Sequence, residues 1–481
     1  MQQMALEEYV DLVRQVDKPL VSRILGIATV FLLALQLRKA LVSRNKLKSI
    51  PTAGSSGIIG SWIDAFRFIS HAKEIVEEGQ RMCGSIFKVP LLDRWTIVVS
   101  GADKINDLRK ASVEQLSSIG MSEDMDYAFG SFIRLDPFHV DIVRGPLTCN
   151  IGACFADVQD EIKAAFKDYI PITEDWVEIP TYETILQIVC RASNRMFVGL
   201  PLCRNREYIK LNTNYTIEIF TFDRFLHLLP TILKTVVSSI YTPRKNAVAK
   251  AEKFLGKTIR ERLEQQNLHG KIGQENQMTS SGGCLTVLTL NIGAIHTTSM
   301  TFTTALCALA AHPEYAETLR NEVESIINEE GYTKAAMGKM NQLDSFVKEA
   351  QRVYGTMSVF GMHRTTRKDF MFSDGTVVPA GVQIVVAILS THTDEENYKD
   401  PLEFKPWRFS EMRKQGENIR HHMATPSLDF VFFGHGRPAC PGRFFAINEL
   451  KALMSYVLLN FDVKIDKFPT PTWFSDHQIP N

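Results

Sequence analysis

Neither sign of charge is in excess in this sequence. Its 481 residues contain 54 lysines and arginines and 54 aspartates and glutamates, so the formal net charge is zero. Proteins that bind nucleic acid usually carry a basic excess, and we therefore expect no nucleic-acid partner. The eight cysteines include no CxxC pair, which argues against a zinc site or a dense disulfide framework and favours a reducing compartment.

Long apolar runs are also absent, with one exception near the N-terminus. Residues 24–37 read ILGIATVFLLALQL and contain no charged side chain; Thr29 and Gln36 are the polar ones. Extended to residues 20–42, the run reaches the ~20 residues that a bilayer span needs. Acidic residues precede it and basic residues follow it, which predicts a cytosolic location for the rest of the chain. A cleaved signal peptide and an interfacial helix are the alternatives, and we expect an uncleaved anchor.

Beyond this run the chain shows no internal repeat and no low-complexity linker, which indicates one domain. Residues 49–60 (SIPTAGSSGIIG) are rich in Pro, Gly and Ser and predict a hinge. Strand-like stretches occur at 86–89, 95–99, 370–378 and 383–388, whereas helical patterns dominate 158–290 and return after Cys440. We therefore expect a mainly α fold with a minor β region, organised as an anchor with its basic flank at 1–48, the hinge at 49–60 and one large domain at 61–481.

The segment around Cys440, FGHGRPACPG, combines glycines and a cysteine in a way that suits a flat ligand. Gly434 and Gly436 let the backbone turn tightly without a side chain meeting that ligand. Gly442 allows backbone amides to approach the sulfur, and we expect the helix that follows to lower the pKa of the thiol. A lone cysteine is more often a buried small hydrophobe, but six positions here fit one pattern, F-G-x-G-R-x-x-C-x-G: Phe433, Gly434, Gly436, Arg437, Cys440 and Gly442.

This pattern resembles the haem-binding signature of the cytochrome P-450 superfamily. The resemblance implies a single cytochrome P-450 fold domain that binds haem b, with Cys440 as the thiolate ligand of the iron and with Phe433, Gly434, Arg437 and Gly442 around the haem. A thiolate opposite oxygen favours O–O cleavage, which is the chemistry of a monooxygenase. An E-x-x-R pair and a P-x-R-F element occur in the family's order, and they imply a buried salt-bridge network behind the haem loop: Glu349, Arg352 and Arg408.

Upstream, the sequence GAIHTT at 293–298 resembles the oxygen-side helix of the family. Thr297 matches the threonine that hydrogen-bonds iron-bound oxygen, and the small Gly293 and Ala294 would let oxygen and substrate approach. The family usually has an acid before this threonine, but His296 stands here. Since histidine can relay protons near neutral pH, we expect Thr297 and His296 to be catalytic. Ordinary core packing of His296 is the alternative.

The resemblance also implies partners for the haem carboxylates, which are costly to bury unpaired. These partners are Arg437 and Arg364, joined by Arg144 and His139. Val140 stands where the family has a tryptophan before Arg144, and this departure weakens the match there.

The expected substrate pocket lies between the oxygen-side helix and two further segments, around 356–362 and 129–138. Its mostly apolar side chains suit an oily substrate that few polar contacts orient. The candidate substrate-binding residues are Ala294, Thr298, Val359, Phe360 and Phe129, with Asn291 and Phe132 beside them.

The chain lacks a G-x-G-x-x-G fingerprint after a strand, so the resemblance implies electron supply from a separate NADPH-dependent flavoprotein reductase. Longer stretches such as DFMFSDGTVVPAG and FGHGRPACPGRFFAINELKA resemble fungal secondary-metabolism enzymes related to ent-kaurene oxidase. We therefore expect a monooxygenase that oxidises a terpenoid (a diterpene, triterpene or meroterpenoid) at the endoplasmic reticulum membrane, with one membrane-spanning helix and its catalytic domain in the cytosol. A haem-thiolate isomerase or dehydratase that acts without dioxygen, and a non-catalytic haem-binding protein, are the alternatives.

Overall fold

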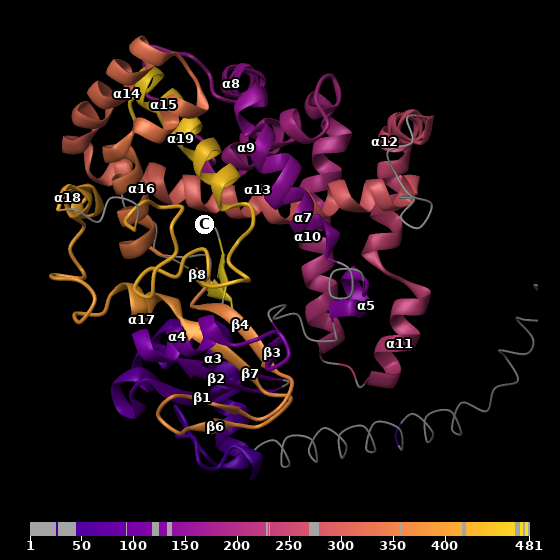
Figure 1. Ribbon diagram of the computed structural model, residues 1–481, viewed down its shortest axis with the longest axis vertical. Helices are drawn as coiled ribbons and strands as arrows, with labels where there is room; N and C mark the ends of the chain where they lie inside the picture. Colours follow the sequence, from indigo (N-terminus) through magenta and orange to yellow (C-terminus); the bar gives the residue numbers. More distant parts are fainter. Residues whose placement is uncertain are drawn as a thin grey trace, which may run out of the picture.

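Figure 1 shows the computed structural model of the chain. It describes residues 26, 45–92, 94–117, 125–131, 137–227, 229, 231–268, 279–355, 358–415, 420–466, 472–474 and 477–479. The expected membrane-spanning run at 20–42 lies outside these residues, apart from Gly26. Within the described ranges, no helix combines the length and the apolar character that crossing a bilayer requires.

Five strands form the principal sheet, in the order β1-β2-β7-β4-β3. The pairs β1–β2, β7–β4 and β4–β3 are antiparallel, whereas β2 and β7 are parallel. The strands predicted at 86–89, 95–99 and 383–388 are confirmed, but the sequence patterns did not predict β4. The strands of this sheet are β1 (Ile86–Pro90), β2 (Trp95–Val99), β3 (Leu116–Ser117), β4 (Phe360–Thr366) and β7 (Gln383–Ala387); two further pairs are β5 (Phe370–Met371) with β6 (Val377–Val378) and β8 (Thr472–Phe474) with β9 (His477–Ile479).

Helices make up most of the rest of the described chain, as the helical patterns predicted. The longest of them, α13 (Ser280–Ala311), runs across the middle of the molecule, and α19 (Arg443–Asn460) follows the cysteine segment (Figure 1). The other α-helices are α3 (Ile58–Cys83), α4 (Ala102–Lys110), α5 (Met125–Phe129), α7 (Phe138–Ile142), α8 (Thr148–Tyr169), α9 (Thr181–Phe197), α10 (Arg206–His227), α11 (Thr231–Ile240), α12 (Pro243–Leu268), α14 (Ala316–Glu330), α15 (Lys334–Lys339), α16 (Asn341–Val353), α17 (Ile388–His392) and α18 (Arg408–Lys414). A π-helix, η1 (Val143–Leu147), links α7 to α8, and two 3₁₀ turns are η2 (Leu202–Arg204) and η4 (Pro313–Tyr315).

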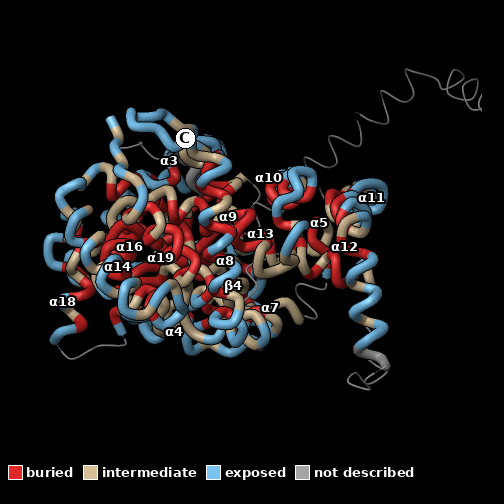
Figure 2. Tube along the Cα trace, turned by 90° about the horizontal axis from the view of Figure 1, so that it is seen from above, coloured by how far each residue is buried: buried red, intermediate tan, exposed pale blue. Residues whose placement is uncertain are grey.

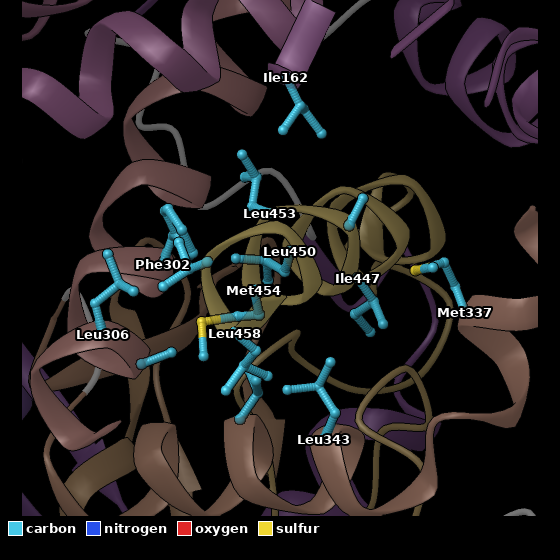
Figure 3. Packing of buried hydrophobic residues seen from close by; sticks show 14 of the residues in the cluster. Ile162, Phe302, Leu306, Met337, Leu343, Ile447, Leu450, Leu453, Met454 and Leu458 are labelled. Atoms are coloured by element: carbon cyan, nitrogen blue, oxygen red, sulfur yellow. The ribbon is translucent and has the colours of Figure 1, made fainter. Parts of the chain in front are cut away.

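The main hydrophobic core surrounds α19. Buried residues concentrate around α9, α16 and α19, whereas α11 and the outer part of α12 are more exposed (Figure 2). Leu450, Leu453 and Met454 of α19 belong to one buried cluster with Phe302 and Leu306 of α13 (Figure 3). Full burial of one such side chain contributes about 1.5–3 kcal/mol. The helix that follows Cys440 is therefore fixed firmly against α13.

The start of the predicted hinge is held against the principal sheet. Leu47 and Ile50 are buried in the core of that sheet. The ammonium group of Lys88 on β1 donates to the carbonyl oxygen of Leu47 at 2.5 Å and to that of Ile50 at 2.8 Å. Thr52 continues this contact as a parallel bridge to Lys88. Ala53 is buried as well, and its amide donates to the carbonyl of Lys88 at 3.0 Å. Residues 47–53 are thus fixed by burial and hydrogen bonds, which leaves the residues between Ala53 and α3 as the place for a hinge.

Candidate active site

The loop before α19 is shaped by two glycines with positive φ. Gly434 has a φ of 67° and Gly436 a φ of 76°, a region that residues with a Cβ adopt only at a cost. A Cβ on Gly436 would also lie 2.8 Å from the carbonyl oxygen of Arg109 at the end of α4. The amide of Cys440 donates to the carbonyl of Phe433 at 2.8 Å and closes the loop. The spacing of the motif thus sets a compact turn that ends at the cysteine.

Cys440 lies at the base of this loop, directly before α19. The backbone amides of Gly442 and Arg443 hydrogen-bond its sulfur, as the glycine at 442 predicted, and the guanidinium of Arg443 lies near it. Burial nevertheless raises the pKa of the Cys440 thiol more than these groups lower it. This result is the reverse of the expectation that the helix start lowers the pKa. A bound metal ion deprotonates a coordinating thiol outright, and the two amides are placed to stabilise the thiolate.

Arg364 on β4 is a buried cation with no carboxylate in ion-pair contact among the described residues. The residue is 4% exposed, and its Nη1 donates to the carbonyl of His363 at 2.8 Å. Burial lowers the pKa of its guanidinium to about 10. Because a buried charge without a counter-charge is costly, this position suits an anionic ligand. A haem carboxylate meets that requirement, so the donor set fits the cofactor that the cysteine pattern implies.

Arg144 and Arg437 come together next to the cysteine loop. Arg144 lies on η1, and its Nη2 donates to the carbonyl oxygen of Arg437 at 2.8 Å. Both side chains are exposed. His139, on the adjoining α7, is partly buried, and desolvation lowers the pKa of its imidazole more than Asp141 raises it. Desolvation thus favours the neutral imidazole, which can donate a hydrogen bond to an anion but cannot neutralise its charge.

Glu349, Arg352 and Arg408 form a buried network behind the cysteine loop. Arg352 donates to both carboxylate oxygens of Glu349 at 2.8 Å, and Arg408 donates to Oε1 of Glu349 at 3.1 Å. Arg352 also donates to the backbone carbonyls of His392 and Pro401. The Glu349 and Arg352 side chains are both fully buried. The structure therefore brings together the three residues of the predicted network and ties the end of α16 to the segment before α18.

The oxygen-side helix α13 has an open face at its middle. Gly293 is exposed, and a Cβ placed on it would meet no other atom within 4 Å. Thr297, one helical turn further on, lies on the same face and is partly exposed; its Oγ1 donates to the carbonyl of Gly293 at 2.6 Å. An open face in the interior of a 32-residue helix is where a ligand and oxygen could approach.

The core around α19 links this face to the cysteine loop. Ala294 of α13 and Phe433 of the loop both pack against the hydrophobic cluster that contains Leu450 and Leu453. The two halves of the predicted site are therefore supported by one rigid group of side chains, although they are about 140 positions apart in the sequence.

His296, the second predicted catalytic residue, is engaged by two other helices. Its Nε2 lies 3.0 Å from the carbonyl oxygen of Thr213 on α10, and its Nδ1 lies 2.9 Å from the hydroxyl of Tyr182 on α9. Burial lowers the pKa of the imidazole. Both ring nitrogens are thus already hydrogen-bonded, as expected for the alternative in which His296 is an ordinary packed residue.

Two predicted pocket residues of α13 are turned away from the open face. Thr298 is rotated by roughly 140° around the helix axis from Gly293 and is buried. Asn291 lies on the same far side, where it accepts a hydrogen bond from Nδ2 of Asn194 on α9 at 2.8 Å. If Gly293 is the centre of the pocket face, helical periodicity places Ala294 and Thr297 on that face. It places Thr298 and Asn291 on the opposite side of α13.

The remaining predicted pocket residues lie in hydrophobic clusters. Phe360 stacks on Phe68 of α3 with ring centroids 5.6 Å apart, and Val359 belongs to the same cluster. Phe129 packs edge-on against Phe220 of α10 at 5.4 Å. These three side chains are at least 95% buried, so packing with α3 and α10 explains their apolar character. Phe132 lies outside the described residues.

Sequence reasoning missed the residues that hold α13 in place. Tyr182 and Thr213 are remote from the oxygen-side motif, and nothing in the local sequence marks them. Arg443 was also missed: its Nη1 donates to the carbonyl of Cys440 at 2.9 Å and its Nε to that of Ala424 at 3.1 Å. Its position three residues after the cysteine is the signal that could have identified it.

Comparisons with known proteins agree with this geometry. The model of the family described as cytochrome P-450 matches residues 173–477. Cytochrome P-450 monooxygenase 151 of Postia placenta is 38% identical over 463 residues, which cover 90% of this chain and 92% of the relative. Cytochrome P-450 monooxygenase 103 of the same fungus is 39% identical, over 91% of this chain and 92% of the relative. Cytochrome P-450 monooxygenase paxQ of Penicillium paxilli is 29% identical, over 91% and 90%.

The cysteine loop, the unpaired buried arginine and the open helix face have the features of a haem-thiolate protein. The chain belongs to the cytochrome P-450 family, and it is a monooxygenase. Membership implies a haem-thiolate iron cofactor, a redox partner and a lipophilic substrate in general terms.

Proposed function

We propose that this monooxygenase inserts an oxygen atom from dioxygen into a lipophilic secondary metabolite, with a terpenoid as the first candidate. The observation that carries the proposal is the pairing of the cysteine loop with the open Gly293–Thr297 face of α13 across one hydrophobic core. A carrier or sensor of haem would not need an open face with a hydroxyl group at its centre. The isomerase or dehydratase alternative would use the same cysteine loop, but this chain is a monooxygenase.

Cys440 is proposed as the residue that would hold the iron of haem b through its thiolate, with the loop residues Phe433, Gly434 and Gly442 around the cofactor. The amides of Gly442 and Arg443 hydrogen-bond the sulfur and would moderate its donation of electrons. Arg364 would hold one haem carboxylate in a buried ion pair, and the exposed Arg437 and Arg144 would serve the other, with His139 as a neutral donor. When bound, the iron supplies dioxygen activation and oxygen transfer.

Thr297 is proposed as the residue that guides proton delivery on the oxygen side of the site. Its hydroxyl donates to the carbonyl of Gly293, so the lone pairs of Oγ1 are directed away from the helix backbone and can accept a hydrogen bond from a water molecule. A water molecule held at this place would supply protons in an orderly way and limit the release of peroxide.

The terpenoid proposal is supported by the apolar surroundings of the open face and by the long stretches that resemble enzymes related to ent-kaurene oxidase. Ala294 and Leu290, the neighbours of Gly293 on α13, are partly exposed and apolar. Such a wall recognises a hydrocarbon skeleton by shape and leaves orientation to few polar groups. The relatives reported above are fungal, which is consistent with a biosynthetic role.

A membrane-bound NADPH-dependent flavoprotein reductase is the proposed electron donor. Basic residues near the cysteine loop are candidates for its docking, but two of them already have acidic partners. Arg413 is buried in an ion pair with Asp344, and Arg408 is held by Glu349. Lys414 remains exposed, and Arg420 is also exposed. These two residues are the proposed docking contacts for the reductase. The N-terminal apolar run supports an anchor in the endoplasmic reticulum membrane, with a catalytic domain over 61–481 that faces the cytosol.

Product formation in membranes that contain the protein and a fungal reductase tests the proposal. A panel of diterpene, triterpene and meroterpenoid precursors is supplied under ¹⁸O₂, with matched samples lacking NADPH or reductase. We expect one precursor to gain a single ¹⁸O atom only in the complete system. A product that forms without NADPH and carries no ¹⁸O would contradict the proposed oxygen insertion. If only a non-terpenoid lipid gives labelled product, the monooxygenase activity stands but the proposal of a terpenoid substrate is wrong.

A further inference from the structure

His296 connects three helices through its two ring nitrogens. The carbonyl of Thr213 can only accept a hydrogen bond, so Nε2 of His296 must carry a proton and donate to it across 3.0 Å. The phenol of Tyr182, 2.9 Å from Nδ1, is then the donor to the unprotonated nitrogen. Tyr182 belongs to α9 and Thr213 to α10, whereas His296 belongs to α13. One imidazole therefore joins α13 to both neighbours directly beside Thr297.

The surroundings of His296 favour the neutral ring. Tyr182 is the titratable side chain in hydrogen-bond contact, the contact on α10 is a backbone carbonyl, and no ion pair of His296 with a carboxylate is found in the described ranges. Burial raises the pKa of the Tyr182 phenol to about 12, so this group stays protonated and keeps donating. Protonation of Nδ1 would reverse the bond to Tyr182: the ring would donate to the phenol oxygen, and the phenol proton would lose its acceptor. The neutral ring is therefore the state that satisfies both the phenol proton and the Thr213 carbonyl.

We propose that His296 is a positioning residue, a neutral cross-link that holds α13 against α9 and α10 at Thr297 and carries no protons in turnover. The neighbouring Thr297 faces the open side of α13, so its position follows that of the helix backbone that His296 fixes. A proton relay through His296 would require breaking at least one of its two hydrogen bonds in every cycle. The inference rests on the proposed function, because the position of Thr297 affects catalysis only if oxygen chemistry takes place beside it.

Three variants separate a cross-link from a relay. His296→Gln keeps a donor for the Thr213 carbonyl and an acceptor for the Tyr182 phenol, but its amide cannot titrate. His296→Leu removes both hydrogen bonds at similar volume. Tyr182→Phe removes one of them and leaves the imidazole. Each variant is purified as the haem-loaded full chain, and its carbon-monoxide difference spectrum shows whether the cysteine side is intact.

Hydrogen exchange of the α10 and α13 backbone is the first readout, and it does not depend on turnover. We expect amides around Thr213 and Thr297 to exchange about tenfold faster in H296L and about threefold faster in Y182F, since each net hydrogen bond contributes about 0.5–1.5 kcal/mol. The H296Q protein should exchange within about twofold of the wild type. Unchanged exchange in both H296L and Y182F would overturn the cross-link.

The second readout is the pH profile of peroxide release during NADPH oxidation with reductase and without added substrate. A cross-link predicts the same profile between pH 5.5 and 8 for the wild type and H296Q, with more peroxide from H296L at every pH. If peroxide release from the wild type changes with pH in this range and that change is absent in H296Q, the imidazole carries protons and the proposal is overturned. Loss of the thiolate-type spectrum in the wild type would instead refute the proposed function, and the exchange data would still decide the cross-link.

Discussion

The cysteine side and the oxygen side of the candidate site are held in different ways. On the cysteine side, Arg352 pairs with Glu349 three positions away, and the loop closes on itself from Cys440 to Phe433. On the oxygen side, His296 is held by partners 83 and 114 positions away in the sequence. These short-range contacts of the cysteine side fall within recognisable motifs, whereas Tyr182 and Thr213, which hold His296, belong to none. The following predictions test this difference, from the largest expected effect to the smallest.

The largest effect is expected from Arg352→Leu. The substitution leaves the Glu349 carboxylate fully buried with only Arg408 and a backbone amide as partners. Breaking such a buried pair costs about 3–5 kcal/mol, so we expect little folded, haem-loaded protein. The free energy of unfolding from a urea titration measures the loss.

Lys73→Leu is the control, since its pair with Glu77 on α3 is exposed and 3.8 Å long; an exposed pair is worth less than about 1 kcal/mol. Equal stability of the two variants would show that the buried network does not hold the cysteine side together.

The two loop glycines should respond unequally to alanine. Gly434→Ala strains the backbone, because its φ is 67°, at a cost of about 1–2 kcal/mol. Gly436→Ala adds a collision with the Arg109 carbonyl, 2.8 Å from the new Cβ, and should cost more. Urea unfolding and the yield of bound haem measure both effects. A larger loss at Gly434 would mean that contact with the haem, not strain in the loop, limits this position.

Glu449 of α19 should make the stability depend on pH. Burial raises the pKa of its carboxyl to about 8, and Ser193 of α9 donates to it at 2.8 Å. The unfolded chain has the ordinary pKa near 4.5, so the folded protein binds the extra proton between about pH 4.5 and 8. Its contribution is complete below the lower pKa and is lost as the pH rises through the higher one.

Glu449→Gln removes this dependence. We expect E449Q to melt at a higher temperature than the wild type at pH 8 and at a similar temperature at pH 5. A melting temperature difference that is the same at both pH values would show that Glu449 is ionised in the folded state.

The smallest effect is expected on the far side of α13. Thr298→Val changes a buried position turned away from Gly293, so the affinity for the haem ligand 4-phenylimidazole should stay within about twofold. Ala294→Val adds volume beside the open face and should weaken that affinity severalfold. Spectral titration measures both constants. A strong effect of Thr298→Val with none of Ala294→Val would place the pocket on the other side of the helix.

The sequence was informative where the chemistry is local. The glycines, Cys440, Gly442 and the Glu349–Arg352–Arg408 set are given by motifs whose spacing a loop or a helix turn imposes, and the structure brings them together. The patterns also predicted a mainly helical fold with a small sheet. They did not predict β4, because its residues were read as part of a pocket wall.

The pocket residues stay predictions, and the sequence defines them less sharply for a physical reason. Phe129, Val359 and Phe360 are apolar, and an apolar side chain fits a hydrophobic core as well as a substrate wall. Only the packing of α3 and α10 distinguishes the two. The sequence could not predict the effect of burial on the pKa of Cys440 either. The helix start that lowers this pKa is local, but the surroundings that bury the thiol and raise the pKa come from elsewhere in the fold.

The central claim is that Cys440 is the thiolate ligand of a haem iron, and the carbon-monoxide difference spectrum of the reduced protein tests it most directly. Membranes containing the wild type, Cys440→Ala and the control Cys149→Ala, an exposed cysteine on α8, are compared at equal haem content. The account predicts a strongly red-shifted Soret band in the wild type and the control, and its loss in the Cys440→Ala protein. A red-shifted band that survives in Cys440→Ala, or that is absent from folded, haem-replete wild type, would contradict it.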